Sequence, residues 1–182
     1  MRNVRASDPL ANPEPLIRRT YAYVAYRIGA GHDAEDVTSS ALERALRYRD
    51  SYDARKGDPL SWLIGIARTC VNDHYASSAA SPGLDDQVAD DQNLETEVAT
   101  RLGVTKAVSA LDDRDRELVA LRYGADLTAK EIGRILGLRT NAVEVALHRC
   151  RDRLRAELER EGQGPTVRPS LRPVALPAAD AR

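Results

Sequence analysis

Side chains that can form hydrogen bonds with base edges are concentrated between residues 139 and 149. Arginine pairs well with guanine and asparagine with adenine, and a glutamate can accept a hydrogen bond from cytosine. The polar side chains of this stretch are Arg139, Thr140, Asn141, Glu144, His148 and Arg149. Residues 139–155 also hold five arginines against two acidic residues, an excess of positive charge that suits phosphates. This stretch therefore has the chemistry needed to read a DNA duplex.

A second group of residues could hold unpaired bases. Three aromatic residues and several cations surround one loop: Tyr48, Tyr52, Trp62, Arg49, Arg55 and Lys56. Aromatic rings stack on unpaired bases, while cations neutralise phosphates. The alternative is that Trp62 and Tyr48 belong to a hydrophobic core and that the cations form a solvated rim. The residue types leave both interpretations open.

The elements that would position the base-reading residues are helical. A capped helix is predicted over residues 111–123, with Gly124 ending it. Thr128 and Glu131 then form a T-x-x-E capping box that opens a short helix. Gly137 breaks this short helix and predicts a tight turn after it.

A long helix is predicted after the turn, with Thr140 as its N-cap. Its apolar stripe consists of Val143, Leu147, Cys150, Leu154 and Leu158. Gly133 is a small residue four positions before the turn glycine, where close helix packing needs one. This order is typical of a helix-turn-helix, whose second helix enters the major groove with its N-terminal part. A packed helical hairpin with a charged, solvated face is the alternative.

Three further helices are predicted over about residues 10–78. The first has an apolar stripe at Ile17, Tyr21, Val24 and Ile28. Gly29 and Gly31 are expected to stop it, and Asp33 to cap the second helix. Asp58 and Pro59 are an N-cap and first-turn proline that open the third. The predicted fold is all-α: two small helical domains, the second containing the helix-turn-helix.

The charge distribution indicates how the domains are divided. The 182-residue chain holds 27 Lys+Arg and 28 Asp+Glu, but residues 79–104 alone hold six acidic residues and one basic residue. This segment is predicted to be a flexible acidic linker. The predicted domains are residues 1–78 and 105–161, followed by a proline-rich, disordered or extended tail over 162–182.

Several other functions are disfavoured. No apolar stretch is long enough to span a membrane and no secretory signal is evident, so a cytoplasmic protein is expected. The two cysteines, Cys70 and Cys150, are expected to be buried thiols, with a disulfide as the alternative. A metal hydrolase would need ligands from a set without metal-site spacing, namely His32, Glu35, Asp36, Asp73 and His74. No metal or cofactor is expected, and the chain is predicted not to be an enzyme.

Three stretches resemble the bacterial RNA polymerase sigma factors of the extracytoplasmic-function (ECF) type. Residues 33–46 are similar to the family's polymerase-binding helix, and residues 52–74 to its promoter-melting and minus-ten-reading segment. Residues 111–158 are similar to its minus-thirty-five-reading helix-turn-helix. The sequence departs from the family pattern at residues 38–41, at Thr69, where asparagine is common, and at Glu144, where lysine or arginine is frequent. The resemblance implies promoter-specific transcription initiation without catalysis.

The resemblance also implies partners and site residues. Core RNA polymerase would contact Asp33, Glu35, Asp36, Val37, Leu42, Arg44 and Arg47. Promoter DNA, melted or duplex, would contact Tyr48, Tyr52, Arg55, Lys56, Trp62, Arg68, Asn72, Asp73, His74, Lys130, Arg139, Thr140, Asn141, Glu144, His148 and Arg149. An anti-sigma factor is a further partner to consider, and no membrane insertion is implied. The alternative function is a helix-turn-helix regulator with an N-terminal dimerisation or sensing domain.

Overall fold

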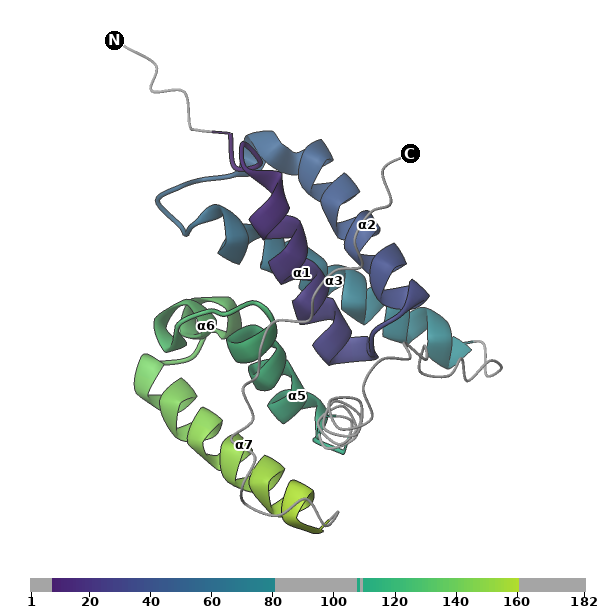
Figure 1. The fold of residues 1–182 in the computed structure, drawn as a ribbon. Coiled ribbons are helices and arrows are strands. Elements are labelled where there is room, and N and C mark those ends of the chain that lie inside the picture. Colours follow the sequence, from purple (N-terminus) through teal and green to yellow (C-terminus); the bar gives the residue numbers. More distant parts are fainter. Residues whose placement is uncertain (1–7, 81–107, 109, 161–182) are drawn as a thin grey trace.

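The chain folds into two groups of helices that pack against each other (Figure 1). The structure is a computed structural model that describes residues 8–80, 108 and 110–160. Every regular element within these ranges is a helix, which confirms the predicted all-α fold with two helical domains. Apart from the two last residues of a helix that ends at Ala80, the predicted acidic linker lies outside the described residues. The predicted tail lies outside them as well.

The N-terminal domain is a bundle of three helices. These are α1 (Pro13–Ile28), α2 (His32–Tyr48) and α3 (Pro59–Ala80), with a short 3-10 turn, η1 (Arg49–Ser51), after α2. Residues of α1 and α3 form much of the hydrophobic core, and Val24, Ile64 and Val71 are among those that are completely buried. The core holds the three helices in place and leaves one face of α3 and the outer face of α2 accessible.

The ends of these helices follow local signals in the sequence. As predicted, α1 stops before Gly29, whose φ of +93° suits a residue without a side chain. Asp58 caps α3 by accepting hydrogen bonds from the backbone N–H and the hydroxyl of Ser61, at 3.0 and 2.6 Å. The predicted cap of α2 was wrong. Gly31 holds the N-cap position, and Asp33 lies in the first turn, where its charge still suits the positive end of the helix dipole.

From Asp113 to Arg160, the C-terminal domain has four consecutive helical elements. They are α5 (Asp113–Val119), the π-helical turn η2 (Ala120–Gly124), α6 (Ala129–Leu136) and α7 (Thr140–Arg160). Asp112 caps α5 by accepting a hydrogen bond from the Asp115 N–H at 2.8 Å. The helical stretch ends at Gly124, as predicted. The π-helical turn was not foreseen.

The predicted capping box and turn between α6 and α7 are both present. The Thr128 N–H donates to Glu131 Oε2 at 2.7 Å, and the Glu131 N–H donates to Thr128 Oγ1 at 3.3 Å. Gly137 has the left-handed φ of +69° that ends α6. Thr140 is the first residue of α7 and not its cap. The preceding carbonyl, that of Arg139, accepts the hydrogen bond from Val143 at 3.1 Å.

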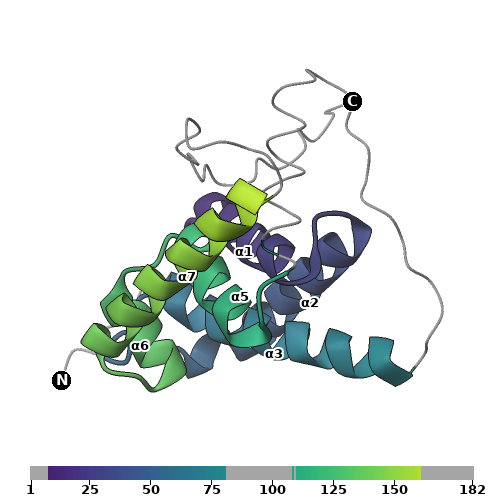
Figure 2. The ribbon, with the colours of Figure 1, turned by 90° about the horizontal axis from the view of Figure 1, so that it is seen from below.

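The two domains share a closely packed boundary in which α1 contacts α5 and η2, and α3 contacts α6. In both Figure 1 and Figure 2, α5 lies between α7 and the N-terminal helices, and α2 lies on the far side of the molecule from α7. Gly124 marks the closest approach, because a Cβ atom placed there would lie 2.9 Å from the Tyr23 Cα and from the Ala22 carbonyl oxygen. Only a glycine allows the backbones to come so near.

Candidate nucleic-acid interface

The N-terminal half of α7 presents an exposed polar face. Val143 and Cys150 are buried in the core. Most of the residues between them point in other directions around the helix and are exposed. The exposed residues of this face are Arg139, Thr140, Asn141, Ala142, Glu144, Val145, His148 and Arg149. Lys130 of α6 is also exposed. The structure therefore brings together all the residues of this region that the sequence suggested for duplex reading.

Ion pairs hold α7 in position on the rest of the domain. Arg153 contacts the carboxylate of Asp115, which is buried, and lies 3.5 Å from Asp112 Oδ2. On the exposed side, an Arg151 guanidinium nitrogen lies 2.9 Å from His148 Nδ1, and Asp152 lies 3.6 Å from the other ring nitrogen. The Arg153 contacts join α7 to α5 and its cap, whereas the His148 contacts lie within α7 itself.

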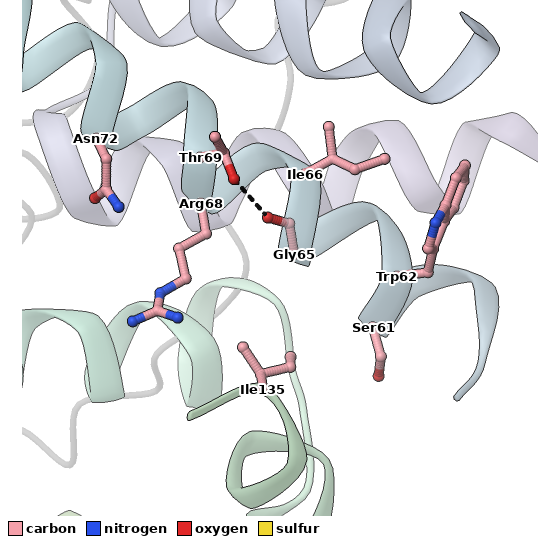
Figure 3. Close-up of a pocket in the computed structure, with 8 residues that line it drawn as sticks. All are labelled: Ser61, Trp62, Gly65, Ile66, Arg68, Thr69, Asn72 and Ile135. Atoms are coloured by element: carbon pink, nitrogen blue, oxygen red, sulfur yellow. Dashed lines mark hydrogen bonds between the residues drawn. The ribbon is translucent and has the colours of Figure 1, made fainter. Parts of the chain in front are cut away.

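A shallow pocket follows the exposed face of α3 (Figure 3). It has a volume of about 470 Å³. Its lining residues are Ser61, Trp62, Gly65, Ile66, Arg68, Thr69 and Asn72 of α3, with Ile135 of α6 opposite them. Three of these, Trp62, Arg68 and Asn72, were suggested from the sequence for contact with single-stranded DNA. An apolar ring, a cation and an amide thus lie along one face at one side of the boundary between the domains.

The loop before α3 divides its aromatic residues between core and surface. Tyr52 is buried, and its hydroxyl donates to the Gly57 carbonyl at 3.0 Å. Its ring packs edge-to-face on the half-buried Trp62, with ring centroids 5.6 Å apart. Tyr48 remains 54% exposed, and Lys56 is also exposed. The core interpretation thus applies to Tyr52, whereas Tyr48 and one side of Trp62 are accessible to a ligand.

Arg55 is exposed but already paired within the loop. Its guanidinium forms two hydrogen bonds with the Asp53 carboxylate, at 3.0 and 3.1 Å, which holds the pKa of that carboxyl below its ordinary value. A nucleic-acid phosphate would therefore compete with Asp53 for Arg55.

The suggested polymerase-binding residues lie mostly on the outer face of α2. Asp33, Glu35, Asp36 and Arg47 are exposed, Leu42 is half-buried and Val37 is buried. Leu46 is an exposed apolar residue on the same helix. Because Val37 packs inward, it supports the face and does not form part of it.

Two pairs of residues link this α2 face to α3. Arg44 lies 2.8 Å from the Asp73 carboxylate, and the His74 ring lies 3.9 Å from that of Asp33. Each pair joins a residue suggested for polymerase binding to one suggested for DNA binding. The two surfaces therefore meet along the contact between α2 and α3.

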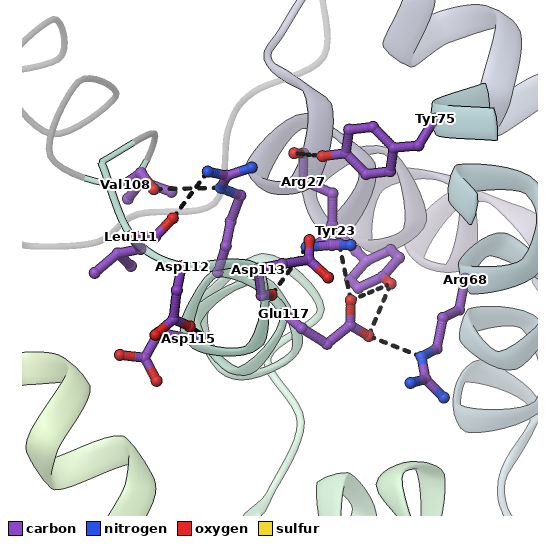
Figure 4. Close-up of polar contacts among 11 residues, drawn as sticks. Tyr23, Arg27, Arg68, Tyr75, Val108, Leu111, Asp112, Asp113, Asp115 and Glu117 are labelled. Atoms are coloured by element: carbon purple, nitrogen blue, oxygen red, sulfur yellow. Dashed lines mark hydrogen bonds and ion pairs between the residues drawn. The ribbon is translucent and has the colours of Figure 1, made fainter. Parts of the chain in front are cut away.

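A polar cluster at the domain boundary was not anticipated from the sequence (Figure 4). The Glu117 carboxylate of α5 accepts hydrogen bonds from the Tyr23 hydroxyl at 3.0 and 3.1 Å. Arg27 Nε lies 2.8 Å from one carboxylate oxygen and Arg68 Nε lies 3.2 Å from the other. Arg27 also donates to Asp113 at 2.7 Å. The four side chains that contact one another around Glu117 come from α1, α3 and α5.

Burial governs the electrostatics of this cluster. Glu117 and Arg27 are only 7% and 3% exposed. Burial raises the pKa of the Glu117 carboxyl above its ordinary value, against the lowering effect of the Arg27 and Arg68 guanidiniums. Burial and the nearby Glu117 carboxylate also raise the pKa of Tyr23, so its hydroxyl keeps its proton and acts as a donor. The ionised carboxylate thus depends on both guanidiniums.

Both cysteines lie in the hydrophobic core. Cys70 and Cys150 are buried free thiols, and burial raises the pKa of Cys150 to about 12. Within residues 8–80, 108 and 110–160, no group of three or more His, Cys, Asp or Glu side chains could hold a metal ion. None of the helices described is both long enough and apolar enough to cross a bilayer.

A helical protein with an exposed recognition helix after a glycine turn is a DNA-binding protein of the helix-turn-helix class. Residues 14–80 match the family described as Sigma-70 region 2, and residues 107–156 match Sigma-70 region 4. The chain belongs to the sigma-70 family and is an ECF-type RNA polymerase sigma factor. Such proteins are non-catalytic and direct promoter-specific transcription initiation with RNA polymerase. This membership rules out the metal hydrolase and disfavours the regulator alternative.

Individual relatives support the same assignment. The ECF sigma factor BldN of Streptomyces coelicolor is 31% identical over 71% of this chain, which spans 52% of the relative's length. The ECF sigma factor ShbA of Streptomyces griseus is 31% identical, and the matched region covers 84% of this chain and 86% of ShbA. The structure of the sigma factor RpoE of Bartonella quintana, solved with the anti-sigma factor NepR, matches with a TM-score of 0.64 at 18% sequence identity. The matched region covers 79% of this chain and 92% of RpoE. The last comparison establishes a common fold.

Proposed function

We propose that the exposed faces of α7 and α3 recognise different parts of the promoter. The face of α7 from Arg139 to Arg149 reads the upstream duplex element, and the face of α3 with Trp62, Arg68 and Asn72 holds unpaired bases of the melted strand. The observation that carries this division is that every polar residue suggested for duplex reading between Arg139 and Arg149 is exposed. Stacking and charge neutralisation stabilise a strand that has already opened, so no catalytic step is needed.

The outer face of α2 is proposed as the contact with core polymerase. Three acidic residues near the start of α2, Asp33, Glu35 and Asp36, are exposed, and further along the same helix the apolar side chains of Leu42 and Leu46 are partly or fully exposed. Exposed apolar residues within a charged rim are characteristic of protein–protein interfaces. Because α2 lies away from α7, polymerase could be bound there without covering the recognition face.

An anti-sigma factor is proposed as a second protein partner, and the cytoplasm as the compartment in which the protein acts. The support for the first is the likeness to the fold of RpoE, which was solved with NepR. The support for the second is that curated relatives are sigma factors, which work with RNA polymerase.

Run-off transcription tests the proposed function. Purified core polymerase and genomic promoter fragments are incubated with and without this protein, and the start sites are mapped. We expect a set of start sites that appears only when the protein is present. If no start site depends on it, the proposed function is wrong.

Replacement of Asn141 by alanine should relax duplex reading at a single base pair. Loss of a bidentate side-chain contact to a base costs about 1–3 kcal/mol, so binding to the preferred upstream element should weaken about 5- to 150-fold. Equilibrium binding to duplexes that differ at one position measures the effect. Glu159→Ala is the control, because Glu159 is exposed on the same helix about 27 Å further along and lies outside the basic stretch over 139–155. Loss of affinity without any change in base preference would contradict base reading by Asn141.

A further inference from the structure

The domain boundary places a carboxylate of one domain against the base-holding face of the other. Glu117 of α5 contacts Arg68 at 3.2 Å, and Arg68 lines the α3 pocket together with Trp62 and Asn72. Ile135 of α6 forms the opposite wall of that pocket (Figure 3). The C-terminal domain therefore lies against the same surface that is proposed to hold melted DNA.

The contact pairs oppositely charged side chains of the two domains. The Tyr23 hydroxyl and Arg27 bind the Glu117 carboxylate from α1, while Arg27 also reaches Asp113. A short distance away, Arg19 of α1 donates to the backbone carbonyls of Ala125 and Asp126, at 2.8 and 2.7 Å. A buried carboxylate is stable only where partners of opposite charge or hydrogen-bond donors meet it, and Glu117 meets two guanidiniums and a hydroxyl.

The arrangement cannot serve both promoter elements at once. Elements centred near positions minus ten and minus thirty-five are 25 base pairs apart, which is about 85 Å of B-DNA at 3.4 Å per base pair. A compact body of about 125 residues has a radius of gyration of about 14 Å and is on the order of 40 Å across. The two domains must therefore separate before both faces can engage one promoter.

We propose that Glu117 is a latch that holds the free protein in a closed, self-inhibited form. Its carboxylate occupies the Arg68 guanidinium in place of a nucleic-acid phosphate, and the docked C-terminal domain borders the reading face of α3 through Ile135. The docking surface is the side of α1 and α3 that carries Tyr23, Arg27 and Arg68, and its occupant is the chain's own second domain. This inference rests on the proposed role of the α3 face.

Opening exposes the latch residues to water. In the closed form, removing the charge of Glu117 leaves Arg27 with Asp113 alone and Arg68 without its interdomain partner. Breaking a buried ion pair by removing one partner is strongly destabilising, whereas the open form solvates both guanidiniums. A substitution at Glu117 should therefore shift the equilibrium toward the open form and leave each domain folded.

Small-angle X-ray scattering of the full chain, without polymerase, tests the latch. Glu117→Gln keeps the shape of the side chain and a partner for Tyr23 but removes the charge. We expect the ratio of closed to open molecules to fall at least about tenfold, with a larger radius of gyration than the wild type has. Glu159→Gln makes the same chemical change at an exposed position of α7 and should scatter like the wild type. Circular dichroism confirms that the helices remain.

A second variant separates the latch from simple packing. Gly124→Val places atoms against the backbone of Ala22 and Tyr23 and should open the domains by steric force. If Gly124→Val expands the protein while Glu117→Gln scatters like the wild type, packing holds the closed form and the latch is wrong. An already extended wild type would also overturn it. These readings need no transcription, so they stand even if the protein never supports a start site.

Discussion

Replacement of Gly133 by alanine is expected to destabilise the helix-turn-helix by about 1–3 kcal/mol or more. A Cβ atom at this position would lie 2.6 Å from the carbonyl oxygen of Leu138, which is a backbone atom in the turn that follows α6. Neither α6 nor the turn can move away easily, because Leu138 donates its N–H to the Gly133 carbonyl at 2.8 Å. The angle between α6 and α7 must therefore change.

The consequence for DNA binding should exceed the loss of stability. A shift of α6 relative to α7 redirects the whole recognition face, so specific binding to the upstream duplex should fall even in molecules that remain folded. Hydrogen exchange of the amides in α6 and α7, compared with those in α2, localises the destabilisation to the C-terminal domain.

A control substitution, Gly65→Ala, is expected to have the opposite effect on stability. Gly65 lies within α3, and a Cβ atom placed there meets nothing within 4 Å. Alanine inside a helix is favoured over glycine by about 0.5–1 kcal/mol, so Gly65→Ala should slightly stabilise the N-terminal domain. If denaturant unfolding showed both alanine variants to be stabilised, the close approach of Gly133 to the turn would be refuted.

The features that could be predicted from the sequence are those set by neighbouring residues. The capping box of Thr128 and Glu131, the left-handed Gly137 and the cap of Asp58 each depend on backbone groups within a few positions. Their side chains have the right hydrogen-bonding groups at the right spacing, so the local chemistry determines where each helix begins or ends. Where two nearby residues can both serve as the N-cap of a helix, these local signals do not decide which of them does. Asp33 and Thr140 were accordingly displaced from their predicted cap positions.

The boundary between the domains could not be predicted in this way. Tyr23 and Glu117 are 94 positions apart, and no local pattern joins them. One signal was nevertheless present, because Arg27 falls three residues after Val24 and next to Ile28, on the apolar stripe of α1. A cation at a core-facing position needs a buried partner. The partner itself, Glu117, could be found only from the fold.

The roles of the aromatic residues also required the structure. Composition placed Tyr48, Tyr52 and Trp62 around one loop but could not assign them to core or surface. In the fold Tyr52 is buried, and its hydroxyl donates a hydrogen bond to the Gly57 carbonyl. Tyr48, at the end of α2, is exposed. Trp62 lies between these extremes, packed on Tyr52 on one side and lining the α3 pocket on the other. Its contribution to promoter melting can therefore be separated from its packing.

Replacement of Trp62 by alanine should reduce promoter opening far more than binding to closed duplex. If an unpaired base stacks on the indole, its loss costs about 1–3 kcal/mol, or about 5- to 150-fold in the open-to-closed ratio. Fluorescence of 2-aminopurine in the melted region measures opening, and electrophoretic mobility of the complex on duplex DNA measures closed binding.

Two further variants decide between stacking and packing. Trp62→Phe keeps an aromatic ring and should restore much of the opening, because every base can stack on a smaller ring as well. Tyr52→Phe removes only the hydrogen bond to Gly57 and should alter stability without a selective effect on opening. Equal losses of opening and closed binding in Trp62→Ala, together with a lower unfolding temperature, would instead assign the indole to the support of the loop. A selective loss that Trp62→Phe reverses would place the ring in contact with the melted strand.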